Sequence, residues 1–409
     1  MDDVFELLRE RGFVYQASDE EGLRHALKKP ITLYNGIDAT ADSLTTGHLM
    51  PLMMMTWFQR AGHNPIALMG GGTSLIGDPT GRTSSRPVLS PEEIEANIEA
   101  IRKQVDQVFS WTGESPMVVN NAEWLTKLGF VEFMREIGSR FSVNEILRLE
   151  AYRTRLEAGG MTFLEFSYVL MQSYDFLRLY EDHGCVLQVG GSDQWGNSVA
   201  GADLVRRVTG GVAFVLVHPL LLAASGAKMG KTAGNAVWLS AERMSPYDYY
   251  QYWRNTDDSQ VESRLGFNTF LPMDEVRRLG SLHGAELNEA KEVLAFEATK
   301  IVHGEEEAVK AQEAARSLFG GDGEGEVPTV ELSGSLFEGD GVPVTVLFRE
   351  AGLVASSNEA RAQIQQGGLA IDGDRVTDPQ ARIGVATLDG RQELMLSRGR
   401  KRHMRVVVG

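Results

Sequence analysis

The fold is decided by one stretch of the sequence, YNGIDATADSLTTGH at residues 34–48. A short apolar segment precedes it, and the long apolar run LMPLMMMTWFQ follows it. We interpret it as a β-strand that breaks into a turn at Asn35-Gly36, followed by a helix with His48 in its first turn. A helix N-terminus offers free N–H groups and a favourable dipole to an anion. The stretch therefore predicts a phosphate site, although a plain strand-to-helix connection with one incidental histidine is the alternative.

Composition restricts the class of protein. The chain has 409 residues, 43% apolar and 23% charged, which is typical of a soluble protein with several domains. We find no segment resembling a secretory signal, and the apolar run at 49–58 is too short to span a bilayer, so we expect a cytoplasmic protein. The single cysteine, Cys185, excludes an internal disulfide and a cysteine-built metal site, and we expect it to be buried.

Apolar segments that run into glycine-rich or polar turns predict the strands of a parallel sheet. Besides the segment before residue 38, these are 64–81, 184–196 and 214–222. Helical patterns fill the region from 90 to 148. Because strands alternate with helices, we expect an α/β fold with a Rossmann-like parallel sheet and helices on both faces.

The texture of the sequence changes after residue 240. Two helical stretches are followed by a glycine-rich acidic segment, and then by a helix, a helix and a hairpin around Asp-Gly-Asp. From residue 341 onward ten Lys and Arg outnumber seven Asp and Glu, although the whole chain carries −16. A locally basic end suggests a partner that is contacted at chosen places. The expected parts are a catalytic domain at 1–220 with a helical insertion, a linker at 221–245 carrying a lysine loop, an α-helical domain at 246–320, a flexible linker at 321–338 and an α+β domain at 339–409.

A second candidate phosphate site is the loop SGAKMGKTAGN at residues 225–235. Lys228 and Lys231 lie three residues apart, and Thr232 follows. Two ammonium groups can neutralise the negative charge that builds on a triphosphate under attack. A P-loop is excluded because the spacing between the glycines is one residue short. A solvated lysine loop is the alternative.

A polar stripe crosses an otherwise apolar helical segment. Tyr168, Gln172 and Asp175 fall at positions i, i+4 and i+7, which places them on one helix face. Polar groups among apolar neighbours are costly unless something pairs with them. A small ligand with an ammonium and a hydroxyl group would pair with this face, whereas an exposed polar face is the alternative.

Polar turns also follow two other predicted strands. One spans residues 188–194, and the other contains Asp78, Arg82 and Arg86. Ligands of an open parallel sheet bind at the carboxyl ends of its strands. A carboxylate such as Asp78 suits an ammonium group, and arginines suit phosphate. Each loop alone is common, but all these groups together suit one ligand.

These motifs resemble those of the bacterial tyrosyl-tRNA synthetases, which are class I aminoacyl-tRNA synthetases. The residues at 45–48 stand where the family has its HIGH signature, and those at 228–232 stand where it has KMSKS. The resemblance covers essentially the whole chain. It is narrowed to tyrosine by Tyr34, Tyr168, Gln172, Asp175 and the segments 77–82 and 190–195. It implies an enzyme that activates L-tyrosine with ATP and Mg²⁺ to tyrosyl-AMP and pyrophosphate, and then moves the tyrosyl group to the 3′ end of tRNA(Tyr). It also implies a homodimer without a permanently bound cofactor or metal.

The resemblance further implies roles for individual residues. Those implied to bind tyrosine are Tyr34, Asp78, Tyr168, Gln172, Asp175, Gln188 and Gln194. Those implied to contact ATP or the adenylate are Gly36, Asp38, Gly47, His48, Gly191, Asp193 and Lys231. Those implied to be catalytic are Thr40, Thr45, His48, Arg82, Arg86, Lys228, Lys231 and Thr232. The C-terminal segment resembles an S4-type RNA-binding domain, and those implied to bind tRNA are Arg398, Arg400, Lys401, Arg402 and Arg405.

The chain departs from the family pattern at two places. Thr45 replaces the first histidine of the HIGH signature, and Gly-Lys-Thr replaces the last three residues of KMSKS. A threonine hydroxyl can still donate a hydrogen bond, but with shorter reach. One donor to a developing charge changes a rate by roughly 10²–10³. Either Thr45 substitutes adequately or the activation of tyrosine is slower.

Three other functions are weighed against this one. A tryptophanyl-tRNA synthetase shares the fold, but Tyr34 with Asp175 favours a phenol over an indole. A non-catalytic RNA-binding paralogue needs only the C-terminal domain and leaves the upstream polar turns unexplained. A P-loop nucleotide hydrolase fails on the glycine spacing.

The basic C-terminus yields a first prediction. Neutralising three of the residues Arg398, Arg400, Lys401, Arg402 and Arg405 should weaken tRNA binding and flatten its salt dependence, because fewer counterions are released from the phosphates. The measurement is the tRNA Michaelis constant of aminoacylation across a salt series. An unchanged constant at every salt concentration would exclude this role.

Overall fold

A six-stranded sheet lies at the centre of the first of two units, Met1–Ala308 and Val309–Gly409. The computed structural model describes residues 3–78, 80, 89–221, 236–319, 329–384, 388, 391, 393–399 and 402–409. Among these residues, no helix is both long enough and apolar enough to cross a membrane.

The sheet of the first unit has the order β1-β6-β5-β2-β3-β4. Its strands are β1 (Gln16–Ala17), β2 (Thr32–Ile37), β3 (Asn64–Met69), β4 (Met117–Asn120), β5 (Cys185–Gly191) and β6 (Phe214–His218). All neighbours run parallel except β1, which pairs antiparallel with β6 at the edge. The expected parallel sheet is therefore confirmed. Cys185 begins β5 and is buried, as expected.

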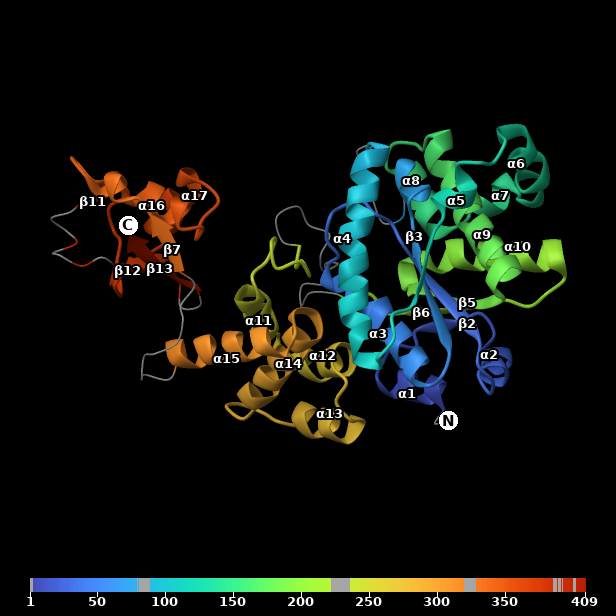
Figure 1. The fold of residues 1–409 in the computed structure, drawn as a ribbon, viewed down its shortest axis with the longest axis horizontal. Helices are drawn as coiled ribbons and strands as arrows, with labels where there is room; N and C mark the ends of the chain where they lie inside the picture. Colours follow the sequence, from blue (N-terminus) through green and yellow to red (C-terminus); the bar gives the residue numbers. More distant parts are fainter. Residues whose placement is uncertain are drawn as a thin grey trace. The chain divides into compact units, whose positions relative to one another are not determined.

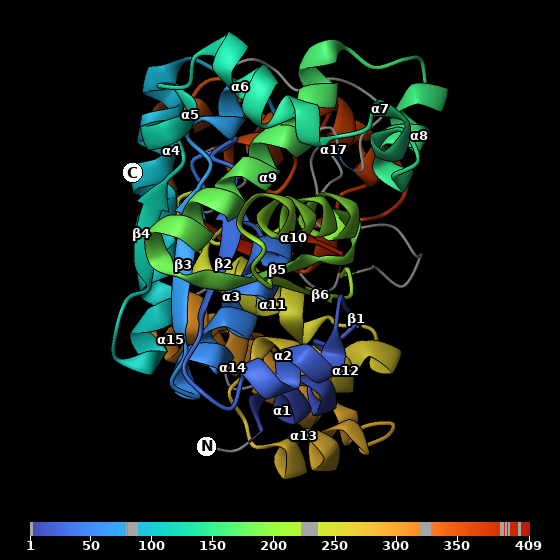
Figure 2. The ribbon, with the colours of Figure 1, turned by 90° about the vertical axis from the view of Figure 1, so that its right-hand side faces the viewer.

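Helices cover both faces of this sheet (Figures 1 and 2). Helix α3 packs on one face with α4 against it, and α9 and α10 pack on the other face. The helices up to α10 are α1 (Val4–Glu10), α2 (Glu20–Ala26), α3 (Thr46–Arg60), α4 (Pro91–Phe109), α5 (Ala122–Leu125), α6 (Phe130–Glu136), α7 (Val143–Ile146), α8 (Glu150–Glu157), α9 (Phe163–His183) and α10 (Trp195–Thr209). Helix α3 is buried along most of its length, which explains the uninterrupted apolar run in its sequence.

Two local expectations are wrong. The region 90–148 is not helical throughout, because Met117–Asn120 forms β4 and pairs with β3. The second error concerns Asn35-Gly36, where a turn was expected. Strand β2 instead continues to Ile37, with Gly36 in register with Leu68 of β3.

A helical segment follows within the first unit, as expected. It comprises α11 (Pro246–Arg254), α12 (Val261–Asn268), α13 (Met273–Gly280) and α14 (Leu287–His303). Arg11 fastens this segment to the N-terminus, because its buried guanidinium donates to the carbonyls of Gly266 and Thr269 at 3.1 Å each. The same guanidinium lies 3.9 Å from the ring centroid of Trp57 in α3. The helical segment is thereby held to the helix that begins at the quoted stretch.

The second unit is an α+β domain, as expected for its C-terminal part. Its main sheet has the order β10-β9-β12-β13-β7. Its elements are β7 (Thr329–Leu332), β8 (Val342–Pro343), α16 (Val344–Glu350), α17 (Ser357–Gln365), β9 (Leu369–Ile371), β10 (Asp374–Arg375), β11 (Arg382–Ile383), β12 (Glu393–Arg398) and β13 (Arg402–Val408). The order helix, helix, hairpin is confirmed, and its core contains Leu347, Phe348 and Leu396.

The linker expected at 321–338 is wrong in its second half. Residues 329–332 form β7, which pairs parallel with β13, so they belong to the folded domain. Two residues of this strand are apolar. Leu332 belongs to the core of this domain, and Val330 packs against that core. Residues 321–328 lie outside the described residues. Helix α15 (Glu305–Phe319) contains residue 308, at which the two units divide. The division of the chain into the five parts expected from the sequence is a proposal.

Candidate active site

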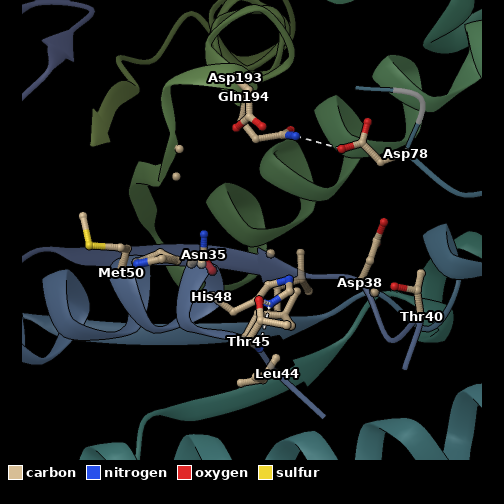
Figure 3. Close-up of a pocket in the computed structure, with 18 of the residues that line it drawn as sticks. Asn35, Asp38, Thr40, Leu44, Thr45, His48, Met50, Asp78, Asp193 and Gln194 are labelled. Atoms are coloured by element: carbon tan, nitrogen blue, oxygen red, sulfur yellow. Dashed lines mark hydrogen bonds between the residues drawn. The ribbon is translucent and has the colours of Figure 1, made fainter. Parts of the chain in front are cut away.

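A cavity of about 560 Å³ opens at the carboxyl ends of β2, β5 and β6 (Figure 3). This is the edge at which ligands of open parallel sheets bind. The cavity is lined by α9, by the N-terminal turn of α3 and by the turn after β5, among other segments. Its residues range from fully buried at Tyr34 to exposed at His48, so it has a closed end and an open end.

Asp175 lies at the closed end of the cavity. The side chain is buried, and two donors hold it: Nδ2 of Asn121 at 2.9 Å and the indole Nε1 of Trp124 at 2.8 Å. Burial raises the pKa of Asp175 to about 7, although both hydrogen bonds oppose this shift. Each carboxylate oxygen can accept a second hydrogen bond. The carboxyl group is therefore fixed in place and retains capacity for a ligand.

Tyr34 and Gln188 complete the closed end. Tyr34 is 1% exposed and packs edge-on against Phe176, and burial beside Asp175 raises the pKa of its phenol well above the ordinary value. Within the described residues, neither the hydroxyl of Tyr34 nor Oε1 of Gln188 has a hydrogen-bond partner. A buried polar group without a partner costs about 1–3 kcal/mol. Both groups line the cavity, so a polar ligand atom can satisfy them.

Asp38 lies where β2 ends and accepts hydrogen bonds from the side chains of Tyr168 and Thr73. Tyr168 of α9 donates to Oδ2 at 3.0 Å, and Thr73 donates to Oδ1 at 2.8 Å. The Asp38 carboxylate lies close to the backbone of residue 70. This position requires glycine, because a Cβ there would lie 2.5 Å from Oδ1 of Asp38. Asn121 also donates to Thr73 at 3.1 Å, which links Asp38 to Asp175 through one network.

A second network joins the turn after β5 to the segment after β3 (Figure 3). Gln194 donates to Oδ2 of Asp78 at 2.8 Å, and the backbone N–H of Thr80 donates to Oδ1. Gln172 donates to Gln194 at 3.4 Å and accepts from Asn197 at 3.1 Å. The polar stripe of α9 is thus paired on both flanks.

The open end is formed by the quoted stretch and the segment after the lysine loop. The backbone N–H of Thr45 donates to Nδ1 of His48 at 3.2 Å, and the Thr45 hydroxyl lies 3.0 Å from the same atom. Thr46 donates to the carbonyl of Val237 at 3.0 Å, and Leu239 donates to that of Leu44 at 2.9 Å. Residues 237–239 therefore run beside the signature turn and fix it. His48 lies in the first turn of α3, as expected.

The cavity gathers most of the residues singled out from the sequence. Those that line it are Tyr34, Gly36, Asp38, Thr40, Thr45, Gly47, His48, Asp78, Tyr168, Gln172, Asp175, Gln188, Gly191, Asp193 and Gln194. Those outside the described residues are Arg82, Arg86, Lys228, Lys231 and Thr232. Among the residues that the structure describes, no three His, Cys, Asp or Glu side chains form a metal site.

Sequence reasoning missed four residues that hold the site: Thr73, Asn121, Trp124 and Asn197. Asn121 and Trp124 follow β4, and the sequence around β4 was interpreted as helical. Recognising the short run Met-Val-Val as a strand would have placed the polar residues after it at the ligand edge of the sheet. No sequence signal marked Thr73 or Asn197.

The proposed tRNA-binding residues of the second unit differ in their surroundings. Arg398 donates to the carbonyl of Leu353 at 3.0 Å and pairs with Glu359 at 2.8 Å. Arg405 lies 3.7 Å from Glu393 across the β12–β13 pair. Arg400 and Lys401 lie outside the described residues, as does the side chain of Arg402.

Comparison with known proteins assigns the chain to a family. Residues 26–320 match the model of class I tRNA synthetases (W and Y), and residues 322–406 match that of the tyrosine--tRNA ligase SYY-like C-terminal domain. A tyrosine--tRNA ligase of Caldanaerobacter subterraneus is 50% identical over 99% of both chains. The chain belongs to the tyrosine--tRNA ligases. It is therefore a class I aminoacyl-tRNA synthetase, and the tryptophanyl and non-catalytic alternatives are unsupported.

Other relatives agree. A tyrosine--tRNA ligase of Lachnoclostridium phytofermentans is 49% identical over 98% of both chains. Among solved structures, a C-terminally truncated mitochondrial tyrosyl-tRNA synthetase of Aspergillus nidulans has a TM-score of 0.70 at 29% identity. The match covers 78% of this chain and 95% of the Aspergillus nidulans chain.

The burial of Asp175 yields a pH prediction. Its pKa is about 7 in the folded protein against 3.8 ordinarily, so the folded state binds the proton more tightly than the unfolded chain. The free energy of unfolding should fall as the pH rises from about 4 to 7, and this contribution should be constant above pH 7. Three pKa units correspond to at most about 4 kcal/mol.

The measurement is urea unfolding of the protein and of Asp175→Asn between pH 5 and 8. The free energy of unfolding of Asp175→Asn, minus that of the wild-type protein, should increase as the pH rises. A difference that is independent of pH would show that Asp175 does not titrate in this window.

Proposed function

We propose that the cavity is the site at which this ligase binds tyrosine and ATP and joins them into tyrosyl-AMP. The proposal is carried by one observation: the buried hydroxyl of Tyr34 has no partner among the described residues and lies beside the fixed carboxyl group of Asp175. The phenol of tyrosine would pair with both groups. Phenylalanine would leave the Tyr34 hydroxyl unpaired, which explains its rejection.

The ammonium group of tyrosine would lie between Asp78, Tyr168 and Gln172. Asp78 supplies a carboxylate that is 7% exposed, and Tyr168 and Gln172 project from the same face of α9. Gln188 and Gln194 would line this half of the cavity, since Oε1 of Gln188 has no partner in the described chain. These contacts would orient the carboxylate of tyrosine toward the open end.

The nucleotide would occupy the open end, against Gly36, Asp38, Gly47, Gly191 and Asp193. A tyrosine carboxylate oxygen would then attack the α-phosphorus, and the bond to pyrophosphate would break. Thr40, Thr45 and His48, which line the cavity, would donate to the developing charge. Arg82, Arg86, Lys228, Lys231 and Thr232 would hold the phosphates. Catalysis on this view is positioning and charge stabilisation.

The second step would transfer the tyrosyl group to the 3′ end of tRNA(Tyr), releasing AMP. Arg398, Arg400, Lys401, Arg402 and Arg405 would contact phosphates of the tRNA. We propose that Mg²⁺ enters with ATP, because phosphate oxygens are the ligands that it prefers. We also propose that the enzyme works in the cytoplasm.

Replacing Tyr34 by Phe tests the proposed role of the Tyr34 hydroxyl. Tyr34→Phe should lower kcat/KM for tyrosine about tenfold, because a hydrogen bond to the phenol is lost. Its kcat/KM for phenylalanine should stay constant or rise. The measurement is ATP–pyrophosphate exchange with tyrosine, phenylalanine and tryptophan.

Tyr249→Phe is the matched control, since Tyr249 is fully buried in α11 and does not line the cavity. It should leave the preference for tyrosine unchanged. An unaltered preference in Tyr34→Phe, or exchange driven by tryptophan, would contradict the assignment of the closed end to a phenol.

We propose in addition that two copies of the chain associate through α6. Phe130 and Val131 are 70% and 77% exposed, whereas Phe133 and Phe141 pack on the inner core. A protein interface would remove these two adjacent apolar side chains from water. The family resemblance implies that the partner is a second copy.

Replacing both exposed residues tests this association. Phe130→Ser with Val131→Ser should give a monomer by sedimentation analysis, because apolar area would be lost from both sides of the interface. Val212→Ser is the control, since Val212 is 63% exposed outside α6 and should not affect the mass. A wild-type monomer, or a dimer in the double variant, would exclude this surface.

A further inference from the structure

His218 stands at the end of β6, next to the nucleotide half of the cavity. All five residues of β6 are buried, and the strand ends at His218. Parallel pairing with β5 puts His218 in register with Gly191. His218 also lines the cavity, together with Gly190, Gly191 and Asp193. No role follows for this histidine from the family motifs discussed above.

One ring nitrogen of His218 is already engaged. Nδ1 lies 2.9 Å from the carbonyl oxygen of Pro219. A carbonyl oxygen only accepts, so Nδ1 carries the proton and donates. Burial also lowers the pKa of His218, although the Pro219 carbonyl and the charge of Asp193 oppose this effect. The imidazole is therefore neutral at neutral pH, and Nε2 carries a lone pair.

The second ring nitrogen of His218, Nε2, is buried. His218 is 3% exposed, and Nε2 has no hydrogen bond from any residue in the described part of the chain. A buried acceptor in this state costs about 1–3 kcal/mol. The cost is recovered if a ligand supplies a donor.

The surroundings favour a ligand on the side of Gly191. A Cβ on Gly191 would lie 3.7 Å from Cε1 of His218, the ring atom beside Nε2, and 2.8 Å from Oδ1 of Asp193. Glycine at this position therefore leaves the space beside the imidazole and the Asp193 carboxylate free of a Cβ, which would also lie 3.2 Å from Cδ2 of Leu220. Two acceptors, the Asp193 carboxylate and His218 Nε2, thus flank one glycine.

We propose that His218 is a nucleotide-binding residue, which accepts through Nε2 a hydrogen bond from a donor on the nucleoside of ATP. A nucleoside offers such donors as the two ribose hydroxyls and the exocyclic amine of the base. This inference rests on the proposed position of the nucleotide against Gly191 and Asp193. It adds a specificity contact supplied by the side chain of β6.

Three ATP analogues separate the possible donors. They are 2′-deoxy-ATP, 3′-deoxy-ATP and purine riboside triphosphate, which lacks the amine. Each is used in tyrosine-dependent pyrophosphate exchange with the wild-type enzyme, His218→Leu and His218→Gln. One analogue should lack the group that donates to His218. With that analogue, kcat/KM of the wild type should fall five- to tenfold more than kcat/KM of His218→Leu. His218→Gln should restore part of that difference, because its amide oxygen can accept.

His63→Leu is the matched control. His63 is also 3% exposed and accepts from the backbone N–H of Ile31 at 3.2 Å, but it does not line the cavity. This variant should lose stability without changing the discrimination between ATP and any analogue. Thermal unfolding of each variant shows that the assayed protein is folded.

The outcomes separate this inference from the proposal on which it rests. If Asp193→Asn raises KM for ATP while no analogue shows a smaller penalty in His218→Leu, the assignment of His218 is overturned and the nucleotide position stands. If Asp193→Asn also leaves KM for ATP unchanged, both are overturned. A reduced penalty for one analogue supports the assignment and identifies the donor.

Discussion

The parallel pairing of β2 with β3 and β5 is the constraint on which the site depends. Parallel strands end at the same edge, so the turns after β2, β3, β5 and β6 converge although they are up to about 180 residues apart in the sequence. Helix α9 then closes this edge with its polar face. The cavity is thus a consequence of sheet direction, and the side chains determine what it binds.

Burial at the closed end gives the cavity its selectivity. Asp175 would be costly in this place without Asn121 and Trp124, and the Tyr34 hydroxyl finds no partner in the part of the chain that the structure describes. At the other end, the backbone N–H of Thr45 donates to Nδ1 of His48, and the Thr45 hydroxyl lies within hydrogen-bond distance of the same atom. The threonine that departs from the family signature is therefore integrated into the turn that begins α3. Its hydroxyl is placed by His48 and by the pairing with residues 237–239.

Much of this arrangement could be predicted from the sequence. Strands that end in glycine, and the spacing of Tyr168, Gln172 and Asp175, depend on local periodicity and so are visible in one chain. The partners of Asp175 could not be predicted, because Asn121 and Trp124 reach it only through the pairing of β3 with β4. The start of the second unit was missed for the same reason, since β7 is a strand only when it pairs with the distant β13. From the sequence His218 was only one residue of the apolar segment 214–222 predicted as a strand, because the lone pair on Nε2 depends on the contact of Nδ1 with Pro219.

The measurement that tests the account most directly is a crystal structure of the enzyme with L-tyrosine and a non-hydrolysable ATP analogue. The account predicts the phenol oxygen within hydrogen-bond distance of Tyr34 Oη and Asp175, with the ammonium group against Asp78. It also predicts the nucleoside against Gly191 and Asp193. Tyrosine bound outside this cavity, or bound with its phenol toward His48, would contradict it.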